Sequence, residues 1–205
     1  MIGGLRMDRR KVLALLPAAP LALAVGPASA RTPLPIDPGA PVGGNPKGDV
    51  TIVAFFDYNC VYCKKAAPDL DRAVAADGRV KLVYLDWPIL TKASVYGALV
   101  ALAAKRQGKY EAVYRGFMAL SGARVTEDQM RAALAGTGVD LTRLQADVDT
   151  HKASIMAALK RTTALADKLG LQGTPTYVIG SGFASTLDYA GFESAIAQAR
   201  ARGGR

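Results

Sequence analysis

Two apolar runs that lack a helical period lie in the first half of the chain. Val50–Phe56 is almost entirely apolar or β-branched, and Val80–Leu85 has the same character. Runs this short and this apolar are typical of strands buried on both faces of a sheet. A helical segment between them would form a crossover connection, so the two strands are predicted to run parallel.

The segment between these runs has the spacing of a helix. Ala67, Leu70 and Val74 lie on one stripe at helical intervals. The pattern predicts a helix over residues 60 to about 76, with Asn59 as its N-cap. A strand, a turn and a helix therefore follow one another in this part of the chain.

The stretch from residue 91 to residue 169 has helical character almost throughout, with glycines that mark breaks. Helices are expected near residues 92–107, 109–121, 127–136, 140–148 and 150–169. After them we expect a hairpin, with strands at 176–179 and 183–187, and a last helix over about 191–202. This alternation of strands and helices places the chain in the α/β class.

The first 30 residues differ from the rest of the chain. They carry four basic side chains, then an apolar run over residues 12–25, then Ala28-Ser29-Ala30. This order is that of a secretory signal peptide, and the apolar run is shorter than the roughly 20 residues that span a bilayer. We expect cleavage after Ala30 and an extracytoplasmic, periplasmic location. Arg9-Arg10 favours the twin-arginine route, and an ordinary Sec signal is the alternative.

Removing the predicted signal peptide leaves a short arm and one domain. The arm, residues 31–48, holds five prolines and is expected to be extended, and the domain is expected over residues 49–203. The whole chain has 26 basic and 17 acidic residues; residues 1–30 hold four and one of them, which leaves 22 and 16, a net charge of +6. The charges are dispersed and not interleaved with aromatic residues, so nucleic-acid binding is not expected.

The chemistry of the chain points to its two cysteines, Cys60 and Cys63. They lie three residues apart, between the first predicted strand and its helix. A thiol at a helix N-terminus meets unpaired N–H groups and the positive end of the helix dipole, which both favour the nucleophilic thiolate. Cys60 is therefore interpreted as the attacking thiol and Cys63 as the resolving thiol.

Two other interpretations of the cysteine pair compete with redox chemistry. Structural zinc normally takes four ligands, and the chain offers only these cysteines and His151, so no metal or other cofactor is expected. A purely structural disulfide is the second alternative, although a bridge that encloses two residues constrains little chain. The strand–helix context favours a redox pair.

Three motifs resemble a known family. Residues 55–63, Phe-Phe-Asp-Tyr-Asn-Cys-Val-Tyr-Cys, resemble the active-site segment of DsbA-like thiol:disulfide oxidoreductases of the thioredoxin superfamily. Pro68 is similar to the proline that bends the first helix of thioredoxin, and residues 173–176, Gly-Thr-Pro-Thr, resemble the cis-proline loop. The resemblance implies a thioredoxin fold with a helical insertion over about residues 91–169, between the second and third core strands.

The resemblance also implies an activity. It indicates an exported enzyme that exchanges disulfides with secreted proteins, most simply a dithiol oxidase that a membrane redox partner re-oxidises. Thr174, a cis Pro175, Val61 and Tyr62 would contact the substrate. A disulfide isomerase or reductase is the alternative, and a non-redox binding module or holdase is a more distant one. The short arm leaves no room for the dimerisation domain of DsbC- and DsbG-type isomerases, so a monomer is expected.

Two positions depart from the pattern of that family. Ala54 lies six residues before Cys60, where many relatives have a glutamate that is thought to move protons for the resolving cysteine. Val61-Tyr62 stands where strong oxidants have proline and histidine. Because neither side chain carries a charge, an intermediate redox potential is expected.

Overall fold

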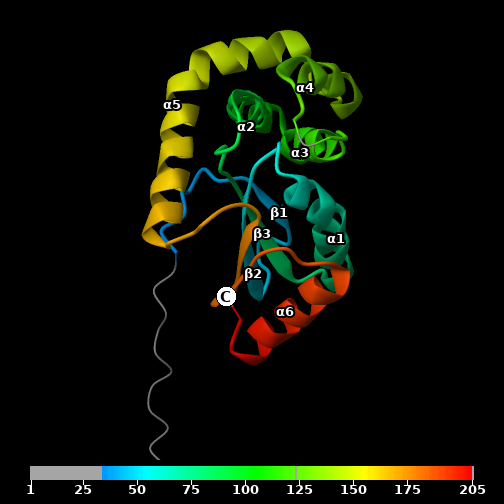
Figure 1. Ribbon diagram of the computed structural model, residues 1–205, viewed down its shortest axis with the longest axis vertical. Helices are drawn as coiled ribbons and strands as arrows, with labels where there is room; N and C mark the ends of the chain where they lie inside the picture. The colour runs from blue at the N-terminus through cyan, green and yellow to red at the C-terminus, as the bar shows by residue number, and fades with distance from the viewer. Residues whose placement is uncertain (1–33, 123, 205) are drawn as a thin grey trace, which may run out of the picture. The chain divides into compact units, whose positions relative to one another are not determined.

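The computed structural model of the chain describes residues 34–122 and 124–204, and a compact unit begins at Pro35. The predicted signal peptide, with its twin arginines and cleavage site, lies outside the described residues. A five-stranded sheet forms the centre of the unit (Figure 1). In spatial order its strands are β1 (Val42–Gly44), β3 (Val80–Asp86), β2 (Val50–Phe56), β4 (Thr176–Ile179) and β5 (Gly182–Ala184).

The two predicted apolar runs form the centre of this sheet. β2 and β3 are parallel, in register from Val50 opposite Val80 to Phe56 opposite Asp86. β4 pairs antiparallel with β2 on its other side. Side chains of β2 and β3 are buried on both faces of the sheet, as expected for continuous apolar strands. The parallel pairing is therefore confirmed.

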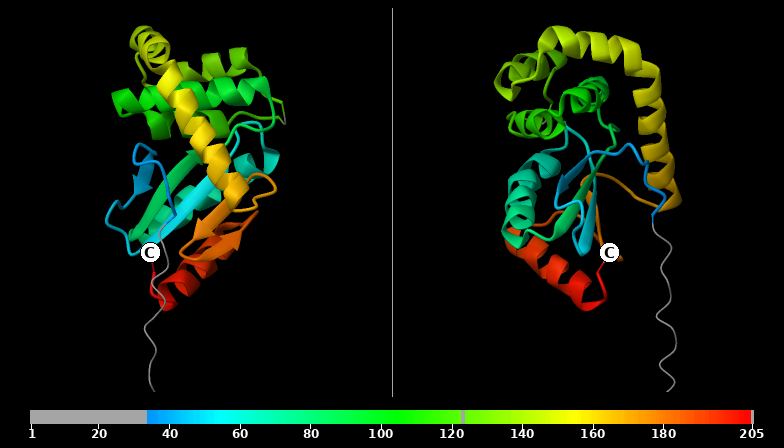
Figure 2. Two further views of the ribbon diagram at one scale, coloured as in Figure 1. Left: turned by 90° about the vertical axis from the view of Figure 1, so that its left-hand side faces the viewer. Right: turned by 180° about the vertical axis from the view of Figure 1, so that it is seen from behind.

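Helices cover both faces of the sheet. α1 (Val61–Asp77), which contains Pro68, and α6 (Tyr189–Ala201) pack against each other on one face, and part of α5 (Leu141–Lys168) runs along the other (Figures 1 and 2). Between β3 and β4 the chain also forms α2 (Lys92–Ala104), η1 (Lys105–Gln107), α3 (Tyr110–Met118), α4 (Glu127–Ala133) and η2 (Leu134–Thr137). This arrangement is the predicted thioredoxin fold, with helices between the second and third core strands.

The structure corrects four details of the sequence analysis. α5 is one helix where a break was predicted near residue 149, since residues 141–168 contain neither glycine nor proline, but it bends sharply along its length (Figures 1 and 2). The N-cap of α1 is Cys60 rather than Asn59, whose side chain bonds elsewhere. The second strand of the hairpin ends at Ala184, because Asp188 caps α6 from Tyr189 onward. β1 was not predicted, since prolines flank it, yet an edge strand tolerates them.

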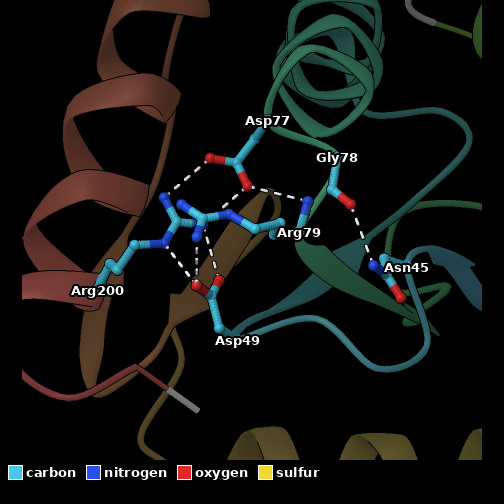
Figure 3. Close-up of polar contacts among 6 residues, drawn as sticks. All are labelled: Asn45, Asp49, Asp77, Gly78, Arg79 and Arg200. Carbon is cyan, nitrogen blue, oxygen red and sulfur yellow. Dashed lines mark hydrogen bonds and ion pairs between the residues drawn. The ribbon is translucent and has the colours of Figure 1, made fainter.

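A cluster of charged side chains joins α6, the start of β2 and the end of α1 (Figure 3). The Arg200 guanidinium in α6 donates two hydrogen bonds to Asp49, just before β2, at 2.8 and 2.9 Å. It donates two more, of the same lengths, to Asp77 at the end of α1. These bonds from Arg200 lower the pKa of both carboxyl groups. We call Arg200, Asp49 and Asp77 the Arg200 cluster.

No helix within residues 34–122 and 124–204 combines the length and apolarity needed to cross a membrane.

Candidate active site

The two cysteines lie where the loop after β2 enters α1. Cys60 is the N-cap of the helix, with an extended backbone (φ −82°, ψ 115°), and Cys63 lies in the first turn. The Cys63 N–H donates to the Cys60 sulfur at 3.2 Å. Both residues are free thiols in this structure, with 4% and 2% of their surfaces exposed. Cys60 therefore occupies the position in which a helix N-terminus stabilises an anion.

The surroundings separate the acidities of the two thiols. Hydrogen bonding from the Cys63 side chain is the largest cause that lowers the pKa of Cys60, and the N–H groups of Cys63 and Tyr62 add to it. The resulting pKa of Cys60 is about 6, despite the opposing effect of burial. Burial is the main cause that raises the pKa of Cys63, and its hydrogen bond to Cys60 acts in the same direction. Near neutral pH, Cys60 is thus the thiolate and Cys63 the thiol.

The loop before β4 lies beside the cysteine pair, at the same edge of the sheet, because the start of β4 pairs with the end of β2. The Thr174–Pro175 peptide bond is cis, the geometry that the family resemblance implied. In its protonated form Cys60 donates a hydrogen bond to the Thr174 carbonyl at 3.2 Å, although 114 residues separate the two. The Thr176 hydroxyl donates to the Gly173 carbonyl at 2.7 Å and closes the loop. The fold therefore brings Thr174 and the cysteine pair together.

The remaining two predicted site residues are exposed. Val61 and Tyr62 form the start of α1 between the cysteines, and 49% and 61% of their surfaces are accessible. Ile89 and Leu90, in the loop after β3, are exposed apolar residues as well. The nearly buried sulfur of Cys60 thus has large apolar side chains in its vicinity.

Comparisons with known proteins agree with this geometry. Residues 37–198 match the family model described as Thioredoxin. The crystal structure of a thioredoxin-like oxidoreductase from Silicibacter pomeroyi shares 41% sequence identity with the chain, covers 80% of it and 94% of its own chain, and has a TM-score of 0.74. The chain is a DsbA-like thiol:disulfide oxidoreductase of the thioredoxin family.

Two further relatives of this oxidoreductase carry related names. The thiol-disulfide exchange protein alpha-DsbA2 from Wolbachia pipientis is 25% identical, with a TM-score of 0.74 over 79% of this chain and 88% of its own. A probable disulfide bond formation protein D from Bacillus cereus is 24% identical over 163 residues, 75% of each chain. The first name states thiol-disulfide exchange, and the second states disulfide bond formation.

A buried aspartate, which the sequence analysis did not single out, holds the loop before the cysteines. Asp57 is 1% exposed. One of its carboxylate oxygens accepts hydrogen bonds from the Asn59 N–H at 2.7 Å and the Ser94 hydroxyl at 2.6 Å, and the other accepts from the Leu90 N–H at 2.9 Å. Asp57 thus joins the redox loop to the segment after β3 and to α2.

Asn59 makes a second set of connections. Its amide oxygen accepts from the Val125 N–H at 2.6 Å, and its amide nitrogen donates to the Val125 carbonyl at 3.1 Å and the Thr91 hydroxyl at 2.8 Å. Asn59 is 3% exposed. The sequence signal for this role was the presence of two polar residues, Asp57 and Asn59, directly after an apolar strand. Their partners could not be inferred from it, because they lie up to 66 residues away. We call Asp57 and Asn59 the polar hub.

A second buried carboxyl group lies at the end of β3. Asp86 is 3% exposed and accepts a hydrogen bond from the Tyr110 hydroxyl at 2.7 Å. Burial raises the pKa of Asp86 to about 7. Its other oxygen and the Tyr58 hydroxyl have no hydrogen-bond partner among the described residues. Aromatic rings fill the space around them, with Tyr58 packed edge-on against Phe56 at 5.3 Å between ring centroids.

Within the described residues, no group of three or more His, Cys, Asp or Glu side chains is placed so that it could hold a metal ion.

Proposed function

We propose that this oxidoreductase is an exported dithiol oxidase that introduces disulfides into secreted proteins through Cys60 and Cys63. The observation that carries the proposal is the position of the Cys60 sulfur at the N-terminus of α1, where the Cys63 N–H donates to it at 3.2 Å and hydrogen bonding lowers its pKa to about 6. A stabilised thiolate favours the reduced enzyme, which makes the disulfide form a better oxidant and Cys60 a better leaving group.

The proposed reaction starts from the Cys60–Cys63 disulfide. A substrate thiolate attacks the Cys60 sulfur, the bond between the two cysteines breaks, and Cys63 leaves and takes up a proton. A second substrate thiolate then attacks the substrate sulfur of the mixed disulfide and displaces Cys60 as a thiolate. The substrate loses two electrons and gains a disulfide, and the enzyme gains the two electrons as a dithiol. Re-oxidation requires an external acceptor, which we propose to be a membrane redox partner.

The other site residues are proposed to position the substrate. Thr174 lies within hydrogen-bonding distance of Cys60, so its main-chain groups can pair with an extended substrate backbone next to the reacting sulfur. Val61 and Tyr62 offer apolar contact beside it. Disulfide exchange in the Wolbachia relative and disulfide formation in the Bacillus relative, as their names state, support the proposed disulfide chemistry.

Equilibration of the Cys60–Cys63 pair with glutathione buffers tests the direction of transfer. An oxidase is expected to have a potential between that of DsbA, about −120 mV, and about −200 mV, since the uncharged Val61-Tyr62 pair gives less stabilisation than a histidine. A potential near the −270 mV of thioredoxin would indicate a reductase instead. Faster rearrangement of a scrambled substrate than oxidation of a reduced one would indicate an isomerase.

Export is a second part of the proposal. It rests on the basic, apolar and small-residue order of residues 1–30. N-terminal sequencing of protein from the extracytoplasmic fraction is expected to begin at Arg31. Retention of the full chain in the cytoplasm would contradict it.

A further inference from the structure

The polar hub and one lysine gather three separate segments around Cys60. Asp57 holds the backbone of Leu90, and Asn59 holds Thr91 and Val125. The Lys64 ammonium donates to the Gly122 carbonyl at 2.9 Å. The start of α1, the loop after β3 and the loop before α4 therefore border one surface around the reactive sulfur.

The uncharged part of this surface is apolar. Its exposed members are Val61 and Tyr62 from the start of α1, and Ile89 and Leu90 from the loop after β3. Adjacent exposed apolar side chains of this size mark interaction sites in folded proteins. Only 4% of Cys60 is exposed, so a partner sulfur has to be brought against this surface to react.

The charged part of the surface is entirely basic. Residues 60–65, 88–92 and 121–125 contain Lys64, Lys65, Lys92 and Arg124 and no Asp or Glu. Lys65, Lys92 and Arg124 are exposed, and Lys64 is partly buried. We call these four residues the basic rim.

The neighbouring carboxyl groups do not neutralise the rim. Asp57 and Asp86 are buried and bonded inward. Glu127 and Asp128, at the start of α4, form no ion pair with a rim residue among the described residues. Burial lowers the pKa of Lys64, and the charges of Asp57 and Cys60 oppose that shift, which places its ammonium within electrostatic reach of the reacting sulfur.

We propose that the basic rim selects substrates, and that the preferred partner is an extended polypeptide segment whose cysteine is flanked by apolar and acidic residues. The inference rests on the proposed function, because it names the substrate class of the same site. Apolar residues of the segment would cover Val61, Tyr62 and Leu90, while its carboxylates meet the rim. Complementary charge of this kind mainly raises the association rate and is weakened by salt.

Two synthetic reduced peptides test the proposal. Both carry one cysteine and the same apolar residues, and they differ only in having two Asp or two Lys residues beside these. Rates of attack on the oxidised enzyme are measured by stopped flow and expressed per thiolate, because the flanking charges also shift the pKa of the peptide cysteine. We expect the acidic peptide to react roughly 10-fold faster at about 20 mM salt, and roughly 2-fold faster at about 0.5 M.

Charge-reversal variants assign the preference to the rim. Lys65→Glu, Lys92→Glu and Arg124→Glu are combined in one protein, and Lys47→Glu, Lys152→Glu and Lys160→Glu in another. All six residues are exposed, and the two proteins have the same net charge. The rim variant is expected to prefer the basic peptide, and the control variant to keep the wild-type preference. Equal loss of preference in both would make net charge the cause and overturn the proposal.

The outcomes also separate this inference from the proposed function. Equal reaction of the wild-type enzyme with both peptides at low salt would overturn the charge selection and leave the oxidase intact. Failure of the oxidised wild-type enzyme to oxidise either the peptides or dithiothreitol would remove the proposed function itself. A preference that stays near 10-fold at about 0.5 M salt would also count against a rim that acts by charge.

Discussion

The two ends of β2 and α1 stabilise charge in opposite ways. At one end, Asp49 precedes the strand and Asp77 ends the helix, and both carboxylates are paired with the guanidinium of Arg200. At the other end, Asp57 follows the strand and Cys60 begins the helix. At that end no arginine within residues 34–122 and 124–204 pairs with the anions: uncharged donors bind Asp57, and N–H groups and a thiol bind Cys60.

The difference shows that one end holds secondary-structure elements together and the other end carries the reactive group. The Arg200 cluster is partly exposed, since side-chain accessibilities are 26% for Arg200 and 41% for Asp49, and salt and water weaken such pairs. The polar hub is buried, so each of its hydrogen bonds is costly to lose. Because the Cys63 thiol and backbone N–H groups, rather than a paired arginine, hold the Cys60 thiolate, its sulfur stays free to form a new bond. The fold thus places the Cys60 thiolate at a helix N-terminus, where backbone N–H groups stabilise its charge.

The largest expected effects come from the cysteines. Cys60→Ser should reduce peptide oxidation to the uncatalysed background, because no sulfur remains to form the mixed disulfide. Cys63→Ser should also stop turnover, but when it is mixed with a disulfide-linked peptide dimer its Cys60 thiolate should displace one peptide thiolate and accumulate as a mixed disulfide, since no resolving thiol is left to release it. Non-reducing gels with mass spectrometry after acid trapping measure this. Equal trapping by both variants would reverse the assignment of attacker and resolver.

The second prediction concerns the pH dependence of the two thiols. Iodoacetamide should alkylate Cys60 of the reduced protein with a midpoint near its pKa of about 6, and should leave Cys63 unmodified up to about pH 8. The folded pKa of Cys60 is below the roughly 8.5 of an unfolded thiol, so the reduced protein should gain stability as the pH rises from 6 to 8.5. The gain should vanish as the pH falls below 6.

The oxidised protein is the control for that linkage. It has no thiol to ionise at either position, so its melting temperature should lack this rise between pH 6 and 8.5. Parallel melting curves for the two redox states would mean that Cys60 is not the thiolate that the geometry indicates.

The third prediction tests the contribution of the buried polar hub to stability. Asn59→Ala removes the acceptor of the Val125 N–H and two donors, so it should cost about 1–3 kcal/mol for the buried group left unpaired. Urea unfolding measures the loss. Asn59→Asp is the matched variant, because it keeps the acceptor but loses the donation to Thr91 and Val125. It should fall between wild type and Asn59→Ala.

The smallest expected effect lies at the opposite end. Arg200→Ala should lower the melting temperature by roughly 2–4 °C and leave peptide oxidation unchanged, since partly exposed ion pairs contribute little. Arg202→Ala is the control, because that arginine is exposed in the same region and its side chain, within the described residues, bonds only to Gln198. A greater loss for Arg200→Ala than for Asn59→Ala would contradict the comparison between the two ends.

The pH dependence of this effect has a definite sign. Arg200 lowers the folded pKa of Asp49 and Asp77, so their contribution is present above the unfolded value of about 3.9 and is lost as the pH falls below it. The melting temperatures of wild type and Arg200→Ala should therefore converge in acid. Scanning calorimetry from pH 7 to pH 3 measures this convergence.

The local features of the protein were determined by its sequence alone. The apolar runs of β2 and β3, the helical stripe of α1 and the cysteine spacing all depend on near neighbours, and those predictions match the structure. The parallel pairing followed from the crossover helix. The sequence also contained the signal for α5 as one helix, because residues 141–168 have no glycine or proline. The prediction of a break near residue 149 was therefore wrong.

Only the tertiary structure decided which distant groups meet. The Thr174 carbonyl reaches Cys60 from 114 residues away, and Asn59 finds Val125 across 66 residues. A hydrogen bond of this kind leaves no periodic trace in the sequence, because its two partners lie on elements that contact only after the sheet and the helices have packed. The same holds for the basic rim, whose members come from three segments. The sequence supplied the reactive pair, and packing supplied the groups that surround it.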